Sequence, residues 1–148
     1  KLIEKNIFDS VNIYFCLTYK DNQSQKILNE LKSYSENLTD NFSRLKIHFY
    51  ISISNSEVLN LLLKSHIYLH PADNEPASYS IVEAFSCGAY VISQENCYTS
   101  DYLPNNKCRK KLKHFTPKNV SKFILENFKS ISSHKNRILR STSNFHKQ

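Results

Sequence analysis

Glycine is almost absent from this sequence, since Gly88 is the only one in 148 residues. The G-x-G-x-x-G fingerprint of dinucleotide-binding enzymes needs three glycines, so the sequence argues against a nicotinamide-dependent enzyme. No stretch approaches the roughly 18 consecutive apolar residues that span a bilayer. Methionine is also absent, and residues 1–5 lack the apolar core of a signal peptide. We therefore expect a piece of a longer protein, large enough for one domain with a real core.

The cysteines show no metal-binding or redox spacing. There are four of them, and none forms a C-x-x-C pair: Cys16, Cys87, Cys97 and Cys108. We expect reduced, structural thiols of the kind found in the cytosol. His66 and His70 are four residues apart, which suits a metal only on a helix, and the residues between them favour a strand. We expect no metal site.

Positive charge is concentrated at the C-terminal end of the sequence. Residues 105–148 hold 12 lysines and arginines against one glutamate, a net charge of +11, whereas residues 1–104 hold 8 against 12 acidic residues, a net charge of −4. A segment this basic suits an anionic membrane surface or a nucleic acid. A solvated helical face explains the same charge, and we favour it. We expect a cytoplasmic protein without a nucleic-acid partner, with the basic segment as the candidate for contact with a membrane surface.

Short apolar segments alternate with amphipathic ones along the chain. Runs of β-branched and aromatic residues predict strands at 11–17, 45–51, 67–70 and 90–92, and an edge strand at 112–115. Apolar residues at helical spacing predict helices over 23–38, 55–65, 80–87 and from 117 onward. This alternation favours a parallel sheet with right-handed crossovers. The predicted fold class is α/β, a Rossmann-like parallel sheet with helices on both faces, in a single domain over residues 1–148.

Local signals mark where three of these helices begin or end. Ser54 and Glu57 have the spacing of a capping box, in which each side chain bonds the backbone N–H of the other residue. Thr116-Pro117 combines an N-cap residue with proline at the first helical position. Gly88 is expected to end the third helix as its C′ residue.

The segment from Leu69 to Gly88 carries the candidate site. It runs from the end of a strand through a polar loop into a helix, with Glu75 in the loop and Glu83 one turn into the helix. Ligands of open α/β sheets bind beyond the carboxyl ends of the strands, where a helix N-terminus attracts phosphate. We expect the two carboxylates to face a common crevice, with backbone amides between them.

Residues 75–92, EPASYSIVEAFSCGAYVI, resemble the signature of the retaining GT-B glycosyltransferases of family four. That signature runs roughly E-P-F-G-L-x-x-x-E-A-M-A-C-G-x-P-V-I. Both glutamates, Ala84 and Gly88 fall in register with it. The resemblance is strong over about residues 45–103, and weaker over residues 11–40 and 112–131.

The resemblance implies the donor-binding, C-terminal half of an enzyme that transfers a hexose from a nucleoside diphosphate sugar to a glycan or lipid-linked acceptor with retention. It implies that Glu75 contacts hydroxyls of the donor sugar and that Glu83 holds the ribose. Ser78 and Tyr79 match the Gly-Leu step, whose amides meet the diphosphate or the sugar, and Ser80 completes the donor-binding set. No cofactor, metal or catalytic side chain is implied.

The same resemblance places several parts of the enzyme upstream of residue 1. These are the first strand of the domain, the arginine and lysine that clamp the diphosphate, and the N-terminal acceptor domain. Chemistry in such an enzyme relies on positioning and on stabilising the leaving diphosphate. We therefore expect this piece to be inactive by itself.

The candidate site residues also have simpler explanations. Ser80 and Glu83 have the spacing of a capping box, so Glu83 could bond only to the start of its own helix. Glu75 could be an exposed loop charge, and capping alone explains Gly88. The sequence leaves these alternatives open.

Two other functions also fit the sequence. Ala77-Ser78 replaces an aromatic-glycine pair, and Tyr90 stands where proline is usual. The next loop offers Asn96, Cys97 and Ser100 in place of glycines, with Asp101 as its acidic residue. These departures suit a catalytically inactive GT-B-like binding or scaffold domain. The basic segment suits a nucleic-acid-binding α/β domain, whose affinity would fall steeply with salt.

Overall fold

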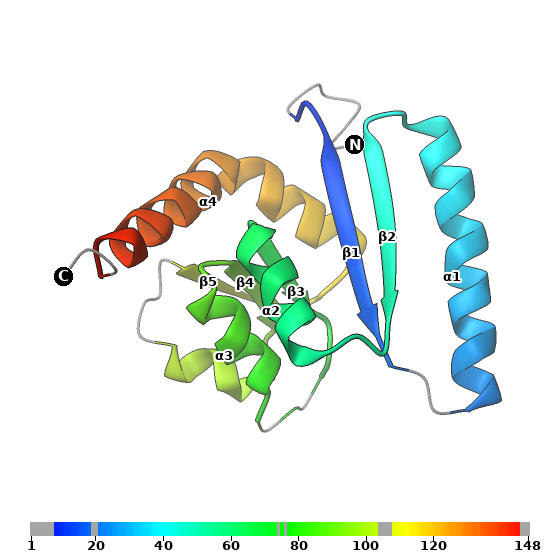
Figure 1. The fold of residues 1–148 in the computed structure, drawn as a ribbon, viewed down its shortest axis with the longest axis horizontal. Helices are drawn as coiled ribbons and strands as arrows, with labels where there is room; N and C mark the ends of the chain where they lie inside the picture. The colour runs from blue at the N-terminus through cyan, green and yellow to red at the C-terminus, as the bar shows by residue number, and fades with distance from the viewer. Residues whose placement is uncertain (1–7, 19–20, 74, 76, 104–107, 146–148) are drawn as a thin grey trace. The chain divides into compact units, whose positions relative to one another are not determined.

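The computed structural model describes residues 8–18, 21–73, 75, 77–103 and 108–145, with side chains as far as residue 133. The elements are β1 (Val11–Leu17), α1 (Asn22–Asn41), β2 (Leu45–Ile51), α2 (Asn55–Lys64), β3 (Ile67–His70), α3 (Tyr79–Ser86), β4 (Tyr90–Gln94), the 3₁₀ helix η1 (Tyr98–Tyr102), β5 (Arg109–Leu112) and α4 (Pro117–Phe145) (Figure 1). Among the described residues, no helix combines the length and the apolar character needed to cross a membrane. The chain divides into two compact units, Lys1–Val58 and Leu59–Gln148, and each is described by itself.

The first unit is built on two parallel strands joined by a long helix. β1 pairs with β2 over its whole length, from Val11 opposite Leu45 to Leu17 opposite Ile51. The Asp21 carboxylate caps α1 by accepting a hydrogen bond of 2.7 Å from the Ser24 N–H. Because α1 runs from residue 22 to residue 41, it extends beyond the predicted range at both ends.

The second unit is a three-stranded parallel sheet in the order β3-β4-β5. Side chains alternate between the two faces of a strand. On one face of β4, the Tyr90 ring lies 5.9 Å from the Phe123 ring of α4. On the other face, Ser93 bonds Ser100 of η1. Helical segments therefore cover both faces, which confirms the predicted α/β class.

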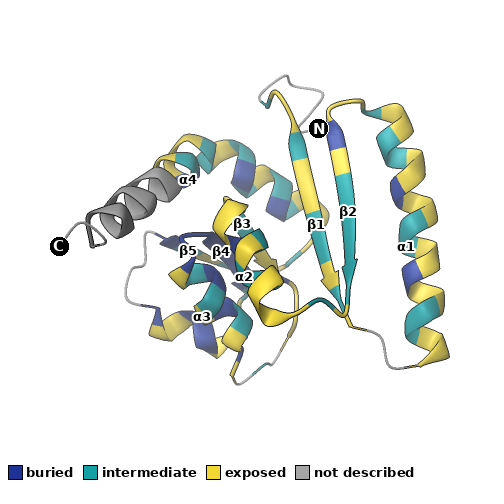
Figure 2. Ribbon diagram, viewed as in Figure 1, coloured by how far each residue is buried: buried dark blue, intermediate teal, exposed yellow. Residues whose placement is uncertain are grey.

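The core of the second unit lies around β4 and α3. Residues 90–93 of β4 are all buried (Figure 2). The buried hydrophobic side chains of this unit are Leu62, Ile81, Ala84, Cys87, Ala89, Tyr90, Val91, Ile92, Cys97, Leu103, Cys108, Val120, Ile124 and Ile131. α3 thus presents Ile81 and Ala84 to the core, whereas Tyr79, Val82 and Ser86 are exposed.

The predicted helix starts at Ser54 and Thr116 are confirmed. The Ser54 N–H donates to Glu57 Oε2 at 2.9 Å, and the Glu57 N–H donates to Ser54 Oγ at 3.4 Å, which is the reciprocal pattern of a capping box. Thr116 Oγ1 accepts a hydrogen bond of 3.3 Å from the N–H of Asn119. Pro117 is the first residue of α4, as predicted.

Gly88 ends α3, also as predicted. Its φ of 78° lies in the left-handed region, which a residue with a Cβ enters only at a cost. The Gly88 N–H donates to the Phe85 carbonyl, and the Ala89 N–H donates to the Ala84 carbonyl, both at 2.9 Å. This is a Schellman motif, and it turns the chain directly from α3 into β4.

Several predicted boundaries differ from the structure. α2 ends at residue 64 instead of 65, and β4 extends to residue 94 instead of 92. α3 covers residues 79–86 instead of 80–87, and the last strand covers 109–112 instead of 112–115. The last strand is misplaced because three consecutive basic residues do not suggest a strand. The Tyr90 hydroxyl fixes this strand beside β4 by donating to the Arg109 carbonyl at 3.0 Å. Lys110 lies over the Phe123 ring at 5.8 Å, so its stem covers apolar surface.

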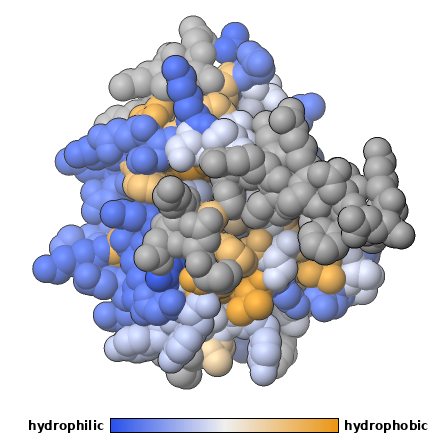
Figure 3. Space-filling view, turned by 90° about the vertical axis from the view of Figure 1, so that its left-hand side faces the viewer, coloured by the Kyte–Doolittle hydropathy of each residue, from blue (hydrophilic) through white to orange (hydrophobic). Residues whose placement is uncertain are grey.

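Some apolar surface remains exposed. Figure 3 shows a hydrophobic patch within a largely hydrophilic face. The exposed large side chains of the second unit are Leu63, Leu69, Tyr79, Val82, Tyr98 and Tyr102. Tyr79 and Val82 belong to α3, so the solvent side of this helix carries apolar as well as polar groups.

Candidate functional site

The candidate site lies at the carboxyl ends of the three parallel strands. His70, Ser93 and Lys111 are register partners at this end, and they share the face of the sheet that α3 and η1 cover. The loop after β3 and the first turn of α3 follow directly. This is the edge at which open α/β sheets bind their ligands.

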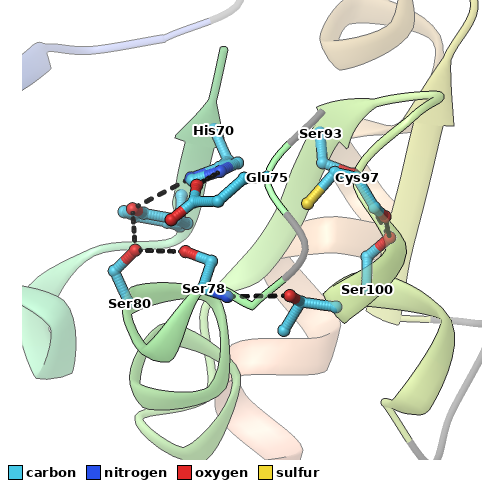
Figure 4. A network of polar contacts seen from close by, with 9 residues as sticks. His70, Glu75, Ser78, Ser80, Ser93, Cys97 and Ser100 are labelled. Atoms are coloured by element: carbon cyan, nitrogen blue, oxygen red, sulfur yellow. Dashed lines mark hydrogen bonds and ion pairs between the residues drawn. The ribbon is translucent and has the colours of Figure 1, made fainter. Parts of the chain in front are cut away.

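Glu75 is paired with a buried histidine. His70, the last residue of β3, is 6% exposed, and its Nε2 lies 2.6 Å from Oε2 of Glu75 (Figure 4). The two atoms form an ion pair when the imidazole is protonated, although they are not aligned as a regular hydrogen bond. The Glu75 side chain itself is 36% exposed. Glu75 is therefore a partly exposed loop carboxylate that also has a partner within the fold.

A chain of hydroxyl groups links the end of β3 to the start of α3. The Tyr68 hydroxyl donates to Ser80 Oγ at 2.9 Å and lies 3.5 Å from Nδ1 of His70. Ser80 Oγ is in turn 2.8 Å from Ser78 Oγ (Figure 4). Two of the predicted donor-binding residues, Ser78 and Ser80, thus share one polar network with the His70–Glu75 pair.

The backbone amide of Ser78 already has a partner in the fold. It donates a hydrogen bond of 2.8 Å to Thr99 Oγ1 in η1, and Ser78 is only 3% exposed. Ser78 is the N-cap residue of α3, yet its side chain makes no capping hydrogen bond. The first-turn amides of Tyr79 and Ser80 therefore lack a cap from Ser78, and such amides are the usual donors to an anion at a helix N-terminus.

Glu83 lies in the second turn of α3, on the same side of the helix as Tyr79 and Ser80. It is partly exposed. Within the described part of the chain, its carboxylate has no hydrogen-bond or ion-pair partner. The capping box of Ser80 and Glu83 is not formed, because the helix begins one residue before Ser80 and Ser78 is its N-cap. The explanation of Glu83 as a helix-capping residue is therefore wrong.

The loop residues that replace the glycines of the signature have structural roles. Ser100 Oγ donates to the Cys97 carbonyl at 2.9 Å, and both residues are fully buried. Asn96 Nδ2 donates to Asp73 Oδ1 at 3.2 Å on the surface. Tyr90, which replaces the usual proline, is held by the Arg109 carbonyl, and burial raises the pKa of its hydroxyl above the ordinary value. Ser100, Asn96 and Tyr90 thus each have a hydrogen-bond partner within the fold.

Asp101 of η1 joins two cations of β5. Its Oδ1 lies 3.2 Å from a guanidinium nitrogen of Arg109, and its Oδ2 lies 2.9 Å from Lys111 Nζ. The hydrogen bond from Lys111 is the main reason why the pKa of Asp101 is below its ordinary value, and Arg109 acts in the same direction. Lys111 Nζ also lies 5.6 Å from the centre of the Tyr98 ring.

Asp101→Asn should lower stability at neutral pH and have little effect in acid. Because the folded-state pKa is depressed, the ion pairs stabilise the protein above the pKa of the unfolded state, and this stability is lost as pH falls through the folded value. The Asp101 side chain is 47% exposed, so we expect only about 0.5 kcal/mol at pH 7. Urea unfolding at pH 7, 5 and 3 measures the difference. Asp40→Asn, at an exposed position on α1, is the control, and a difference that grows toward acid would contradict the assignment.

Two residues of this site were not among those predicted. The sequence offers His70 only as a metal ligand, and it gives no role to Thr99. A polar residue at the end of an apolar strand was the available signal for His70, since strand ends face the ligand edge of the sheet. Thr99 contacts a residue 21 positions earlier, and nothing in its local sequence indicates that contact.

A separate hollow of about 190 Å³ lies in the first unit, between the end of β1 and the start of α1. It is lined by Leu17, Thr18, Ser24, Ile27, Leu28 and Leu31. Among the described residues, this lining is largely apolar and contains no charged side chain.

Known proteins are similar to this chain in sequence and in fold. The family model described as "Glycosyl transferases group 1" matches residues 28–138. Over 58 residues, the chain is 38% identical to the phosphatidylinositol N-acetylglucosaminyltransferase gpi3 subunit of Schizosaccharomyces pombe, a match that covers 39% of the chain and 13% of that relative.

The fold also resembles a solved glycosyltransferase domain. The crystal structure of the catalytic domain of cholesterol-alpha-glucosyltransferase from Helicobacter pylori matches with a TM-score of 0.50 and 15% sequence identity, covering 92% of this chain and 99% of that chain. At this identity the likeness shows the fold alone, whereas the family model covers most of the sequence. The chain belongs to the group 1 glycosyl transferase family and has the GT-B type of α/β fold.

Proposed function

We propose that this chain binds the nucleoside diphosphate sugar of a glycosyltransferase that transfers a hexose, with retention, to a glycan or lipid-linked acceptor. The family match over residues 28–138 is the observation that carries this proposal. The position of Glu75, Glu83 and the first turn of α3 beyond the strand ends supports it. Neither a cofactor nor a metal has a part in it.

In this proposal, each group of residues contacts one part of the donor. Glu83 accepts hydrogen bonds from the ribose, and Glu75 accepts them from hydroxyls of the transferred sugar. The amides of Tyr79 and Ser80 bind the diphosphate, helped by the partial positive charge of the helix N-terminus. Ser78 contributes by its position at the start of α3 and not by an amide contact, because its own amide donates to Thr99. Stabilising the leaving diphosphate is then the main electrostatic task of the site.

The named relative suggests which substrates to test first. That protein is called a phosphatidylinositol N-acetylglucosaminyltransferase subunit. By analogy we propose an N-acetylhexosamine donor and an inositol-containing lipid acceptor. The net charge of +11 in residues 105–148 supports peripheral contact with an anionic membrane surface, on the cytoplasmic side.

Titration of the chain with UDP, GDP, ADP and their sugar derivatives tests the proposal. We expect one nucleotide pair to bind, and Glu83→Gln to weaken both members of that pair about 10-fold, since a charged hydrogen bond contributes roughly 1.5–3 kcal/mol. Glu126→Gln is the matched control, because Glu126 lies on α4, where it pairs only loosely with Lys122 at 3.9 Å. Isothermal titration calorimetry gives the dissociation constants.

A different result would favour the inactive binding or scaffold domain. The occupied amide of Ser78 is the structural observation in favour of that alternative. If no nucleotide binds at millimolar concentration to a folded protein that also carries the expected upstream arginine and lysine, the donor-binding proposal is wrong. Equal affinity of the wild type and Glu83→Gln would remove Glu83 from the site.

A further inference from the structure

His70 is a buried polar group for which the proposed donor contacts provide no role. Its side chain is 8% exposed and lies at the carboxyl end of β3, between the Glu75 carboxylate and the Tyr68 hydroxyl. A buried imidazole loses its hydration, so it requires polar partners that an aliphatic residue would not need. The partners here are Glu75 at Nε2 and Tyr68 at Nδ1, and Figure 4 shows the imidazole lying against the Glu75 side chain.

The two members of this pair differ in exposure. The carboxylate of Glu75 is accessible, whereas the imidazole behind it is not. Oε2 of Glu75 is the atom paired with His70, and a carboxylate has further lone pairs that can accept hydrogen bonds from a ligand. A long glutamate side chain on a loop would otherwise sample several rotamers, and fixing them upon binding reduces affinity.

We propose that His70 is a positioning residue that holds the Glu75 carboxylate in place for the hydroxyls of the donor sugar. This inference rests on the proposed function, and it concerns the sugar rather than the nucleotide. Through Tyr68 and Ser80, the same imidazole is connected to the first turn of α3, where the diphosphate would bind. His70 therefore sets the orientation of Glu75 relative to that turn, and with it the selectivity for the sugar.

Binding of a nucleoside diphosphate and of its sugar derivative to His70 variants tests this role. UDP and UDP-N-acetylglucosamine are the first probes, replaced by another base if the titrations above favour one. His70→Gln keeps an N–H donor near the position of Nε2, whereas His70→Ala removes it. We expect His70→Ala to weaken the sugar nucleotide about 10-fold and His70→Gln by less than about 3-fold. The affinity for UDP should stay within twofold in both variants.

The controls separate positioning from folding. His66→Ala removes an exposed histidine just before the same strand and should change neither affinity. Circular dichroism and thermal melting verify that each variant is folded. If His70→Ala does not fold, His70→Asn takes its place, because its shorter amide does not reach Glu75.

The outcomes distinguish the positioning role of His70 from the proposed binding of the donor. If the wild type binds no nucleotide, the proposed function is wrong and the role of His70 falls with it. If nucleotides bind but His70→Ala leaves the sugar contribution unchanged, the positioning role is wrong and the proposed function stands. Equal losses for UDP and for the sugar nucleotide, without rescue by glutamine, would make His70 merely structural.

Discussion

Glu75→Ala is expected to weaken binding of the nucleoside diphosphate sugar by about 100-fold and to leave the affinity for the nucleoside diphosphate within twofold. A hydrogen bond from a sugar hydroxyl to a carboxylate contributes roughly 1.5–3 kcal/mol, and a factor of 100 corresponds to about 2.7 kcal/mol. The substitution also leaves the buried His70 without its carboxylate partner. Calorimetric titration with both ligands measures the two affinities.

The matched control for this prediction is Glu95→Ala. Glu95 is an exposed glutamate in the loop after β4, beyond the same ends of the strands. Its removal tests whether a general loss of negative charge near the site alters binding. If Glu95→Ala reproduces the loss, or if Glu75→Ala weakens both ligands equally, Glu75 does not contact the sugar.

Ile92→Ala should lower the free energy of unfolding by about 2–4 kcal/mol. Ile92 is fully buried at the centre of the middle strand, and truncating such a side chain leaves a cavity that the surrounding side chains fill only in part. Urea unfolding followed by far-ultraviolet circular dichroism gives the difference in free energy.

Leu69 provides the control within the same row of the sheet. It is the register partner of Ile92 on β3, but its side chain is 45% exposed. Because it buries less apolar area, Leu69→Ala should cost about 1 kcal/mol. Equal costs for the two substitutions would mean that β4 is not the centre of the core.

Local chemistry predicted the helix ends well. Ser54 with Glu57, Thr116 with Pro117, and Gly88 each act through backbone groups within a few residues, so the sequence contains all the partners. The last strand was misplaced for the opposite reason. Arg109 and Lys111 are stabilised in a strand by Asp101, which lies 8 and 10 residues earlier, and no periodicity of apolar residues reveals that contact.

The sequence predicted which segment forms the site, but it did not predict the contacts within the site. The strand–loop–helix order around Glu75 and Glu83 followed from composition and from the resemblance. The bond between Ser78 and Thr99 joins α3 to η1 across 21 residues, and it changes which amides are left for a ligand. His70 and Glu75 are close in sequence, but their contact depends on the path of the loop, which the sequence does not specify.

The alternation of cations along β5 also favours the observed strand register and opposes aggregation at the edge of the sheet. Lys110 covers Phe123 on one face, while Arg109 and Lys111 meet Asp101 on the other. A register slip of one residue would place two charges on the apolar face and leave Asp101 with one, so this pairing register is strongly favoured. Because β5 is the terminal strand in the described order, its three cations also repel a strand from another molecule and oppose edge-to-edge aggregation.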